Sequence, residues 1–269
     1  MFQGKYQEKY WEFFDALIKA AERDHILGKY KGKEYEQHPD GWGLVIIHRG
    51  TQRYMVYKSL KSIFEERNIL KKLLNQVLGQ EVSIIAHARN AGTFKKNIES
   101  VHPFSYVTNS ATTIFVAHNG SLSKEFFGNE LKLNEIIVEN LCDSHLFAMW
   151  VAQKWNSFEK SLKELVIKNV VKSALNVFIA ELSDAEPTLY AISYLNEEYL
   201  RKKGKTEEQI KILRNYYRLH YCINEILVFA SSTVADYVSI IPREEWMTLK
   251  LSGELIRVLH RNITTAGLI

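Results

Sequence analysis

The first stretch of the chain distributes hydrophobic and polar residues with the period of a helix. Between positions 6 and 27, hydrophobic residues recur at spacings of three and four, and charged side chains fall on the opposite side. A polar loop follows and ends in the run His38-Pro39-Asp40-Gly41-Trp42-Gly43, where proline and glycine exclude regular structure. The pattern therefore predicts one amphipathic helix followed by a loop.

Short runs of aliphatic and β-branched residues predict buried strands along the rest of the chain. The runs 44–47 and 54–57 are expected to pair as a hairpin, and further helices are expected over 62–78, over 143–168 and after the capping-box sequence Thr206-Glu207-Glu208-Gln209. The remaining strands are expected at 82–86, 113–117, 174–180, 189–193, 226–230, 238–241 and 255–259. This order predicts helices layered on sheets, and no linker-like stretch separates a second domain within 1–269.

Composition narrows the class of protein. The chain has 269 residues, of which 46% are hydrophobic, so it can bury a large core. Its net charge of +4 is spread along the sequence, which argues against nucleic-acid binding. The two cysteines, Cys142 and Cys222, lack metal-ligand spacing and suggest no disulfide framework. No apolar stretch has membrane-spanning length and the N-terminus lacks a signal-peptide core, so a cytoplasmic protein without metal or cofactor is expected.

Two of the predicted strands run directly into polar clusters. The strand at 82–86 is followed by His87-Ala88-Arg89-Asn90, and the strand at 113–117 is followed by His118-Asn119-Gly120. A rigid strand that ends in an exposed polar loop is a common position for catalytic groups. We expect both strands to lie in the same sheet and to deliver Arg89 and Asn119 to one cleft.

Each polar residue also has a simpler interpretation. The Asn119 amide and the Gly120 N–H could point two donors at an oxyanion, but an Asn-Gly pair taken alone favours a tight turn. Arg89 could hold a carboxylate or form an ordinary surface ion pair. Asp143 could bind an ammonium group and at the same time cap the helix that follows. Trp42 could equally cover a ligand or cap the core.

The order of the motifs is more specific than any one of them, and it resembles that of class II glutamine amidotransferases. The similarity is greatest to the small stand-alone members, such as the γ-glutamyl-amide hydrolases of ergothioneine and glutathione metabolism. It covers about residues 7–150 and implies an α+β fold, a four-layer αββα sandwich of the N-terminal-nucleophile type. The motifs that carry it are Asp40-Gly41-Trp42-Gly43, Ile85-Ala86-His87-Ala88-Arg89, His102-Pro103-Phe104, Val116-Ala117-His118-Asn119-Gly120 and Asp143-Ser144.

The resemblance implies a role for each matching residue. Arg89 would bind the α-carboxylate of glutamine or of a γ-glutamyl group, and Asp143 would bind the α-amino group. Asn119 and Gly120 would form the oxyanion hole. The implied partners are this small-molecule substrate and a separate acceptor subunit, with a homodimer left open. The residues that would further line the pocket are Asn90 and His102.

The sequence departs from the family at its start. The family's nucleophile is an N-terminal cysteine whose own α-amino group is the base, whereas this chain begins Met1-Phe2. Cys142 has no free α-amine and is not expected to replace it. The first strand, which carries the cysteine at its start in the family, is also expected to be missing, with Met1 to Lys5 as at most its tail. A truncated start and a natural pseudoenzyme both explain these features, and the chain as given is expected to be inactive.

Two other functions stay open at this stage. One is a non-catalytic module that binds a γ-glutamyl group or an amino acid and regulates a partner. The other is an unrelated α/β domain whose motifs are coincidental turns.

Overall fold

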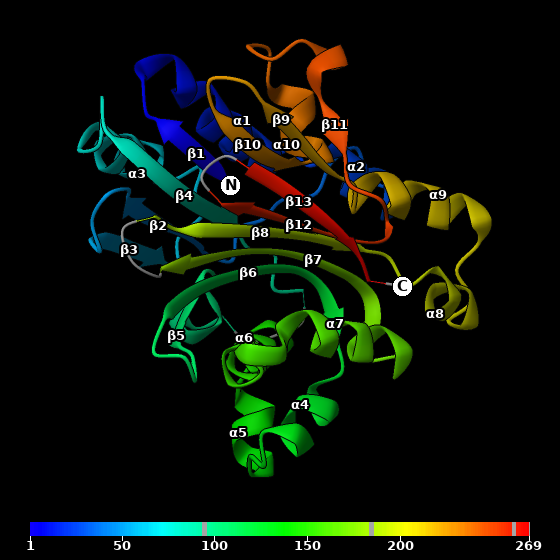
Figure 1. The fold of residues 1–269 in the computed structure, drawn as a ribbon. Helices are drawn as coiled ribbons and strands as arrows, with labels where there is room; N and C mark the ends of the chain where they lie inside the picture. The colour runs from blue at the N-terminus through cyan, green and yellow to red at the C-terminus, as the bar shows by residue number, and fades with distance from the viewer. Residues whose placement is uncertain (93–95, 183–185, 260–261, 269) are drawn as a thin grey trace.

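The computed structural model describes residues 1–92, 96–182, 186–259 and 262–268. Two antiparallel sheets lie face to face in the middle of the molecule, with helices on both outer sides (Figure 1). The predicted four-layer αββα sandwich is therefore confirmed. None of the helices in these ranges is long and apolar enough to cross a membrane.

The first sheet contains seven strands, and the first strand of the chain lies at its centre. β1 pairs with β10 on one side and with β4 on the other. In spatial order the strands are β11 (Met247–Thr248), β9 (Leu219–Ile223), β10 (Leu227–Ser231), β1 (Phe2–Lys5), β4 (Glu81–Ala88), β2 (Trp42–His48) and β3 (Tyr54–Ser59).

The second sheet contains six strands, and its two longest lie side by side. β6 and β7 pair over most of their length. The spatial order is β13 (Asn262–Gly267), β12 (Ser252–Leu259), β8 (Thr188–Tyr194), β7 (Val171–Leu182), β6 (Thr113–Leu122) and β5 (Phe104–Val107).

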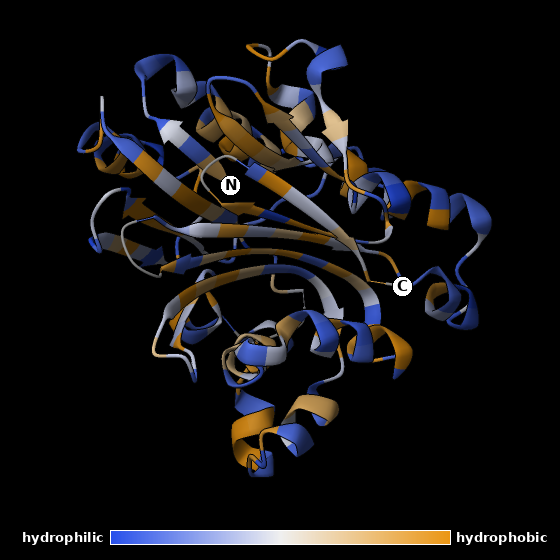
Figure 2. Ribbon diagram, in the orientation of Figure 1, coloured by the Kyte–Doolittle hydropathy of each residue, from blue (hydrophilic) through white to orange (hydrophobic). Residues whose placement is uncertain are grey.

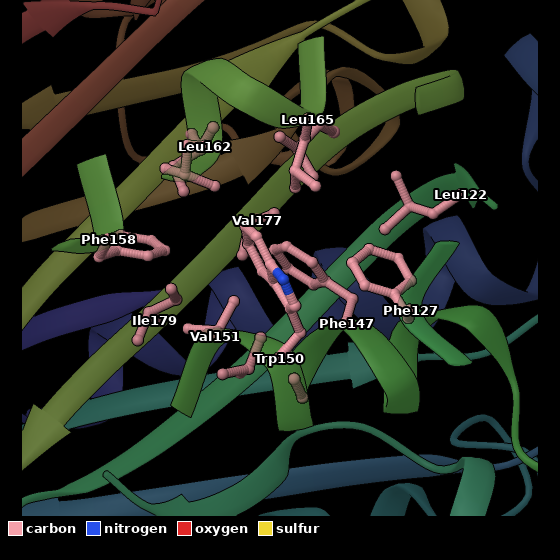
Figure 3. Close-up of a cluster of buried hydrophobic side chains, with 14 of the residues drawn as sticks. Leu122, Phe127, Phe147, Trp150, Val151, Phe158, Leu162, Leu165, Val177 and Ile179 are labelled. Carbon is pink, nitrogen blue, oxygen red and sulfur yellow. The ribbon is translucent and has the colours of Figure 1, made fainter. Parts of the chain in front are cut away.

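Each sheet buries its outer face under helices and its inner face against the other sheet. Side chains of α1 (Trp11–Glu22) and α3 (Arg67–Asn75) pack on the first sheet. The second sheet is covered by α4 (Lys124–Glu130), α6 (Asp143–Gln153) and α7 (Phe158–Ile167), whose aromatic and aliphatic side chains meet β7 in Figure 3. Figure 2 shows hydrophobic residues along many strands of both sheets. The other helical elements are η1 (Glu8–Tyr10), α2 (His25–Tyr30), η2 (Ile98–Ser100), α5 (Glu135–Asn140), η3 (Trp155–Ser157), α8 (Glu197–Lys202), α9 (Glu207–Tyr216), α10 (Ser232–Tyr237) and η4 (Arg243–Glu245).

The expectation of a missing first strand is wrong. β1 is short and contains polar residues, yet Phe2 and Gln3 are 2% exposed. The Phe2 ring packs among aromatic residues of α1, and the Gln3 amide donates to Ser83 Oγ over 3.2 Å. A buried polar residue with a partner is stable in a strand, but it breaks the hydrophobic pattern by which strands are predicted.

Other predicted elements were confirmed or corrected. The hairpin of β2 and β3 and the capping box at Thr206 are confirmed. The first helix is interrupted between α1 and α2, and the helix expected over 143–168 is interrupted between α6 and α7 by η3. The expected strand at 238–241 does not form.

Candidate active site

A cavity of about 650 Å³ opens where the carboxyl-terminal end of β4 meets β6. This volume is in the range of small-molecule sites, roughly 300–1,000 Å³. Arg89 and Asn119 both line the cavity, so the expectation of a shared cleft is confirmed. They come from different sheets, however, and the expectation of a single sheet is wrong. The other predicted site residues at its wall are Asn90, His102, Gly120 and Asp143.

Arg89 follows β4 directly and is held through its backbone. Its N–H donates to the Gly41 carbonyl over 2.8 Å, and its carbonyl accepts from the Asp40 N–H over 3.0 Å. The residue is only 5% exposed, so the interpretation as a surface ion pair is wrong. A guanidinium in such a buried position suits a carboxylate ligand.

Asn90 and Trp42 have structural contacts of their own. The Asn90 amide donates to the Gln37 carbonyl over 2.9 Å, so this side chain also fixes the preceding loop. Trp42 is completely buried, and its indole N–H donates to Glu66 Oε2 over 3.0 Å. Trp42 belongs to the core on the helix side of the first sheet, which settles its two interpretations in favour of the core.

Asp143 is the first residue of α6, and Cys142 takes the N-cap position without a side-chain bond. The expectation of an Asp143 N-cap is therefore wrong. One carboxylate oxygen accepts from the Leu122 N–H and the other from the Ser144 N–H, each over 2.8 Å. These bonds fix the carboxylate between β6 and α6. Because a carboxylate oxygen accepts more than one hydrogen bond, capacity for an ammonium ligand is left.

Asn119 and Gly120 lie inside β6 rather than in a turn. They pair with Asn176 and Leu175 of β7, and the register shifts just after Gly120. Gly120 has a φ of +149°, and a Cβ atom there would lie 1.9 Å from the Ala174 carbonyl oxygen. Only glycine fits this position, and an irregularity of this kind is typical of strands that present groups to an active site.

Two histidines lie against each other in the cavity wall. The rings of His87 and His102 are 4.2 Å apart between centroids. Burial lowers the pKa of His87 to about 3, and burial together with His87 lowers the pKa of His102 well below its usual value. Both are therefore neutral at neutral pH. Among the residues that the structure describes, neither His102 nitrogen has a hydrogen-bond partner.

Most residues that line the cavity were not predicted as site residues, and those with polar groups include His87, Asn176, Tyr216 and, through its α-amino group, Met1. His87 lies in a motif that had already been singled out. Asn176 and Tyr216 lie far along the chain in segments without a polar signature. Met1 was missed because its contribution is its α-amino group, which donates to the Phe229 carbonyl over 2.8 Å and whose pKa burial lowers to about 5.

Tyr216, at the end of α9, contacts the predicted oxyanion donor. Burial raises the pKa of Tyr216 well above its ordinary value, and its hydroxyl is hydrogen-bonded to the Asn119 side chain. The hydroxyl therefore stays protonated and fixes one side of the Asn119 amide. Within the described ranges, no three histidine, cysteine or carboxylate side chains are arranged to hold a metal ion.

Comparison with known proteins agrees with this geometry. Residues 27–179 match the family model described as class-II glutamine amidotransferases. A search of curated proteins found no relative. The fold is similar to the allosteric regulatory enzyme of purine biosynthesis, with a TM-score of 0.58 at 13% identity, over 100% of this chain and 49% of that one.

A second similar structure is the glutamine phosphoribosylpyrophosphate amidotransferase from B. subtilis. Its TM-score is 0.56 at 13% identity, over 100% of this chain and 48% of the other. The chain thus spans about half the length of these two enzymes. The fold is that of the N-terminal-nucleophile hydrolases, and the family match covers more than half of the sequence. The chain belongs to the class II glutamine amidotransferases.

Proposed function

We propose that this site, once it is supplied with an N-terminal cysteine, hydrolyses the side-chain amide of glutamine or of another γ-glutamyl compound. The observation that supports this most is the arrangement of four groups around one cavity. The buried Arg89 guanidinium and the Asp143 carboxylate suit the α-carboxylate and α-ammonium of an amino acid. Asn119 and Gly120 supply donors for an oxyanion.

The internal cysteines are poor candidates for the nucleophile. Cys142 lines the cavity, but burial raises the pKa of its thiol, which disfavours the reactive thiolate. Cys222 lies on β9, and burial raises the pKa of its thiol as well. Met1 and Phe2 carry no thiol. The proposed reaction therefore needs a thiol that is delivered from elsewhere.

The first sheet offers a path for that thiol in line with β1. Phe2 pairs with Ile84 and Val228, whereas β4 continues to Ala88 and β10 to Ser231. In the same register, two further residues ahead of Met1 would lie between these two strands. The cavity crosses the sheet at this place, because residues on both faces line it, including Leu17 of α1 and Asn119 of β6.

Successive side chains of a strand point to opposite faces of the sheet, and this alternation decides which of the two positions ahead of Met1 suits a nucleophile. Phe2 packs on the helix side of the sheet, and Met1 packs against the cluster between the two sheets. The position two residues ahead of Met1 would again face the space between the sheets. Asn119 faces the same space, since Phe115 and Ala117 of β6 belong to that cluster. A cysteine at that position would thus face the oxyanion donors.

The chemistry in the proposed site is acyl transfer. The N-terminal α-amine takes the thiol proton, the thiolate attacks the amide carbon, and a carbon–sulfur bond forms. The carbon–nitrogen bond then breaks as the nitrogen takes up that proton and leaves as an amine, and water hydrolyses the thioester. In the chain as it stands, burial lowers the pKa of the Met1 α-amino group to about 5, so this amine is neutral at pH 7.

The test is an engineered variant with Cys-Arg placed directly before Met1 and with its free N-terminal cysteine verified by mass spectrometry. We expect it to release ammonia from glutamine. The matched control with Ala-Arg and the chain as given should release none. If the cysteine variant binds glutamate but releases no ammonia from glutamine or γ-glutamyl amides, the proposal is wrong and the alternative of a binding module is supported.

A further inference from the structure

Asn176 lies next to the predicted oxyanion donor, on the neighbouring strand. It is directly opposite Asn119 in the pairing of β6 with β7, and it lines the cavity. Side chains opposite each other in an antiparallel pair have Cβ atoms roughly 5 Å apart. The residue is 4% exposed, so its polar atoms depend on partners inside the protein or in a ligand.

The orientation of the Asn176 amide is fixed by its hydrogen bond to Tyr217. Its Nδ2 donates to the backbone carbonyl of Tyr217. A carbonyl oxygen can only accept, so the nitrogen must face Tyr217 and Oδ1 must be the other atom. In the part of the chain that the structure describes, this buried Oδ1 has no hydrogen-bond partner. Asn176, a residue that lines the cavity, therefore has a buried acceptor without a donor.

The proposed substrate has few groups that could supply the donor. Its α-carboxylate has none, and its α-ammonium is assigned to Asp143. The oxyanion accepts and does not donate. The scissile amide nitrogen is the remaining donor, and it is bonded to the same carbon as the oxygen that Asn119 would bind.

We propose that Asn176 Oδ1 accepts a hydrogen bond from the nitrogen of the scissile amide and makes the site selective for amides over esters. The inference rests on the proposed function, because it takes that substrate as given. Asn176 binds the N–H without taking a proton. An ester of the same shape has no hydrogen at this position, so it leaves the buried oxygen unpaired, and sites of this kind reject such analogues strongly.

The test compares the binding of glutamine with that of glutamate γ-methyl ester by calorimetry on the chain as it stands. We expect glutamine to bind at least tenfold more tightly. Asn176→Ala should reduce this preference to less than about threefold, mostly by weakening the binding of the amide. Asn176→Ser serves as a second variant, since its small polar side chain leaves the site less apolar than alanine does. Asn119→Ala is the matched comparison and should keep the preference.

The outcomes separate the inference from the function on which it rests. If Asn176→Ala and Asn176→Ser fold and keep the wild-type preference for the amide, the inference is wrong. If the wild-type chain binds both ligands equally, it is wrong as well. If the cysteine-bearing variant hydrolyses neither compound, the proposed function fails, whereas a preference that depends on Asn176 would still support a site for the amide nitrogen.

Discussion

Gly120 can be tested by adding a single carbon atom. In Gly120→Ala, the new Cβ would lie 1.9 Å from the Ala174 carbonyl oxygen and 2.9 Å from His118 Nε2. The backbone φ of +149° is also one that residues with a Cβ rarely adopt. Two penalties, steric overlap and backbone strain, should therefore act together.

Two other glycines separate these penalties. Gly50 has a φ of +76° and no atom within 4 Å of its Cβ position, so Gly50→Ala meets strain alone. Gly43 has no positive φ, but its Cβ would lie 2.0 Å from the His102 carbonyl oxygen, so Gly43→Ala meets overlap alone. We expect losses in the free energy of unfolding of about 1 kcal/mol for Gly50→Ala and about 3 kcal/mol for Gly43→Ala. Gly120→Ala should lose at least as much as Gly43→Ala, about 3 kcal/mol or more, because it combines a comparable overlap with strain.

The assay is chemical denaturation of the wild type and the three variants, extrapolated linearly to water. Equal slopes would show that the variants unfold from equally compact states. If Gly120→Ala loses no more than Gly50→Ala, then β6 moves away from β7 at little cost. In that case the close approach of the two strands does not explain the glycine.

Three further predictions concern the site. Arg89→Ala and Asp143→Ala should each weaken glutamate binding tenfold to a hundredfold in calorimetry, and Asn119→Ala much less, because its donor is directed at a transition-state oxyanion; equal losses would contradict these roles. The unfolded state should take up a proton at His87 below pH 6.5 that the folded state refuses until about pH 3. The free energy of unfolding therefore decreases as the pH is lowered, by up to about 1.4 kcal/mol per pH unit. In denaturation experiments, His87→Asn should show a smaller decrease between pH 6 and pH 4. In the cysteine-bearing variant, Tyr216→Phe should lower kcat about tenfold and leave KM unchanged, since the hydroxyl orients Asn119; a change in KM alone would count against that role.

The sequence was sufficient to predict the strands that consist of an uninterrupted run of hydrophobic residues. β2, β4 and β7 are buried on both faces, and such runs are recognisable without any tertiary information. β1 was not recognisable, because Gln3 is compatible with burial only through a partner distant in the sequence, Ser83. The break before α7 was missed because the sequence there contains no proline or glycine.

The positions of Arg89 and Asn119 were predicted only in part. Their place at the ends of two hydrophobic runs correctly indicated one shared cleft. The pattern could not tell whether two buried strands lie side by side or face each other, since both arrangements bury the same residues. Asn176 and Tyr216 were not predicted because they reach the cavity through strand register and the course of α9.

The two facing sheets would suit the proposed acyl transfer. A carbonyl carbon under attack must meet a nucleophile on one side while its oxygen meets donors on another. Stacked sheets lie about 10 Å apart, which leaves room for a planar amide once both sides contribute a side chain. Met1 at the start of the first sheet and Asn119 of the second line one cavity, so the two partners of the proposed reaction would be set by the packing of the sheets.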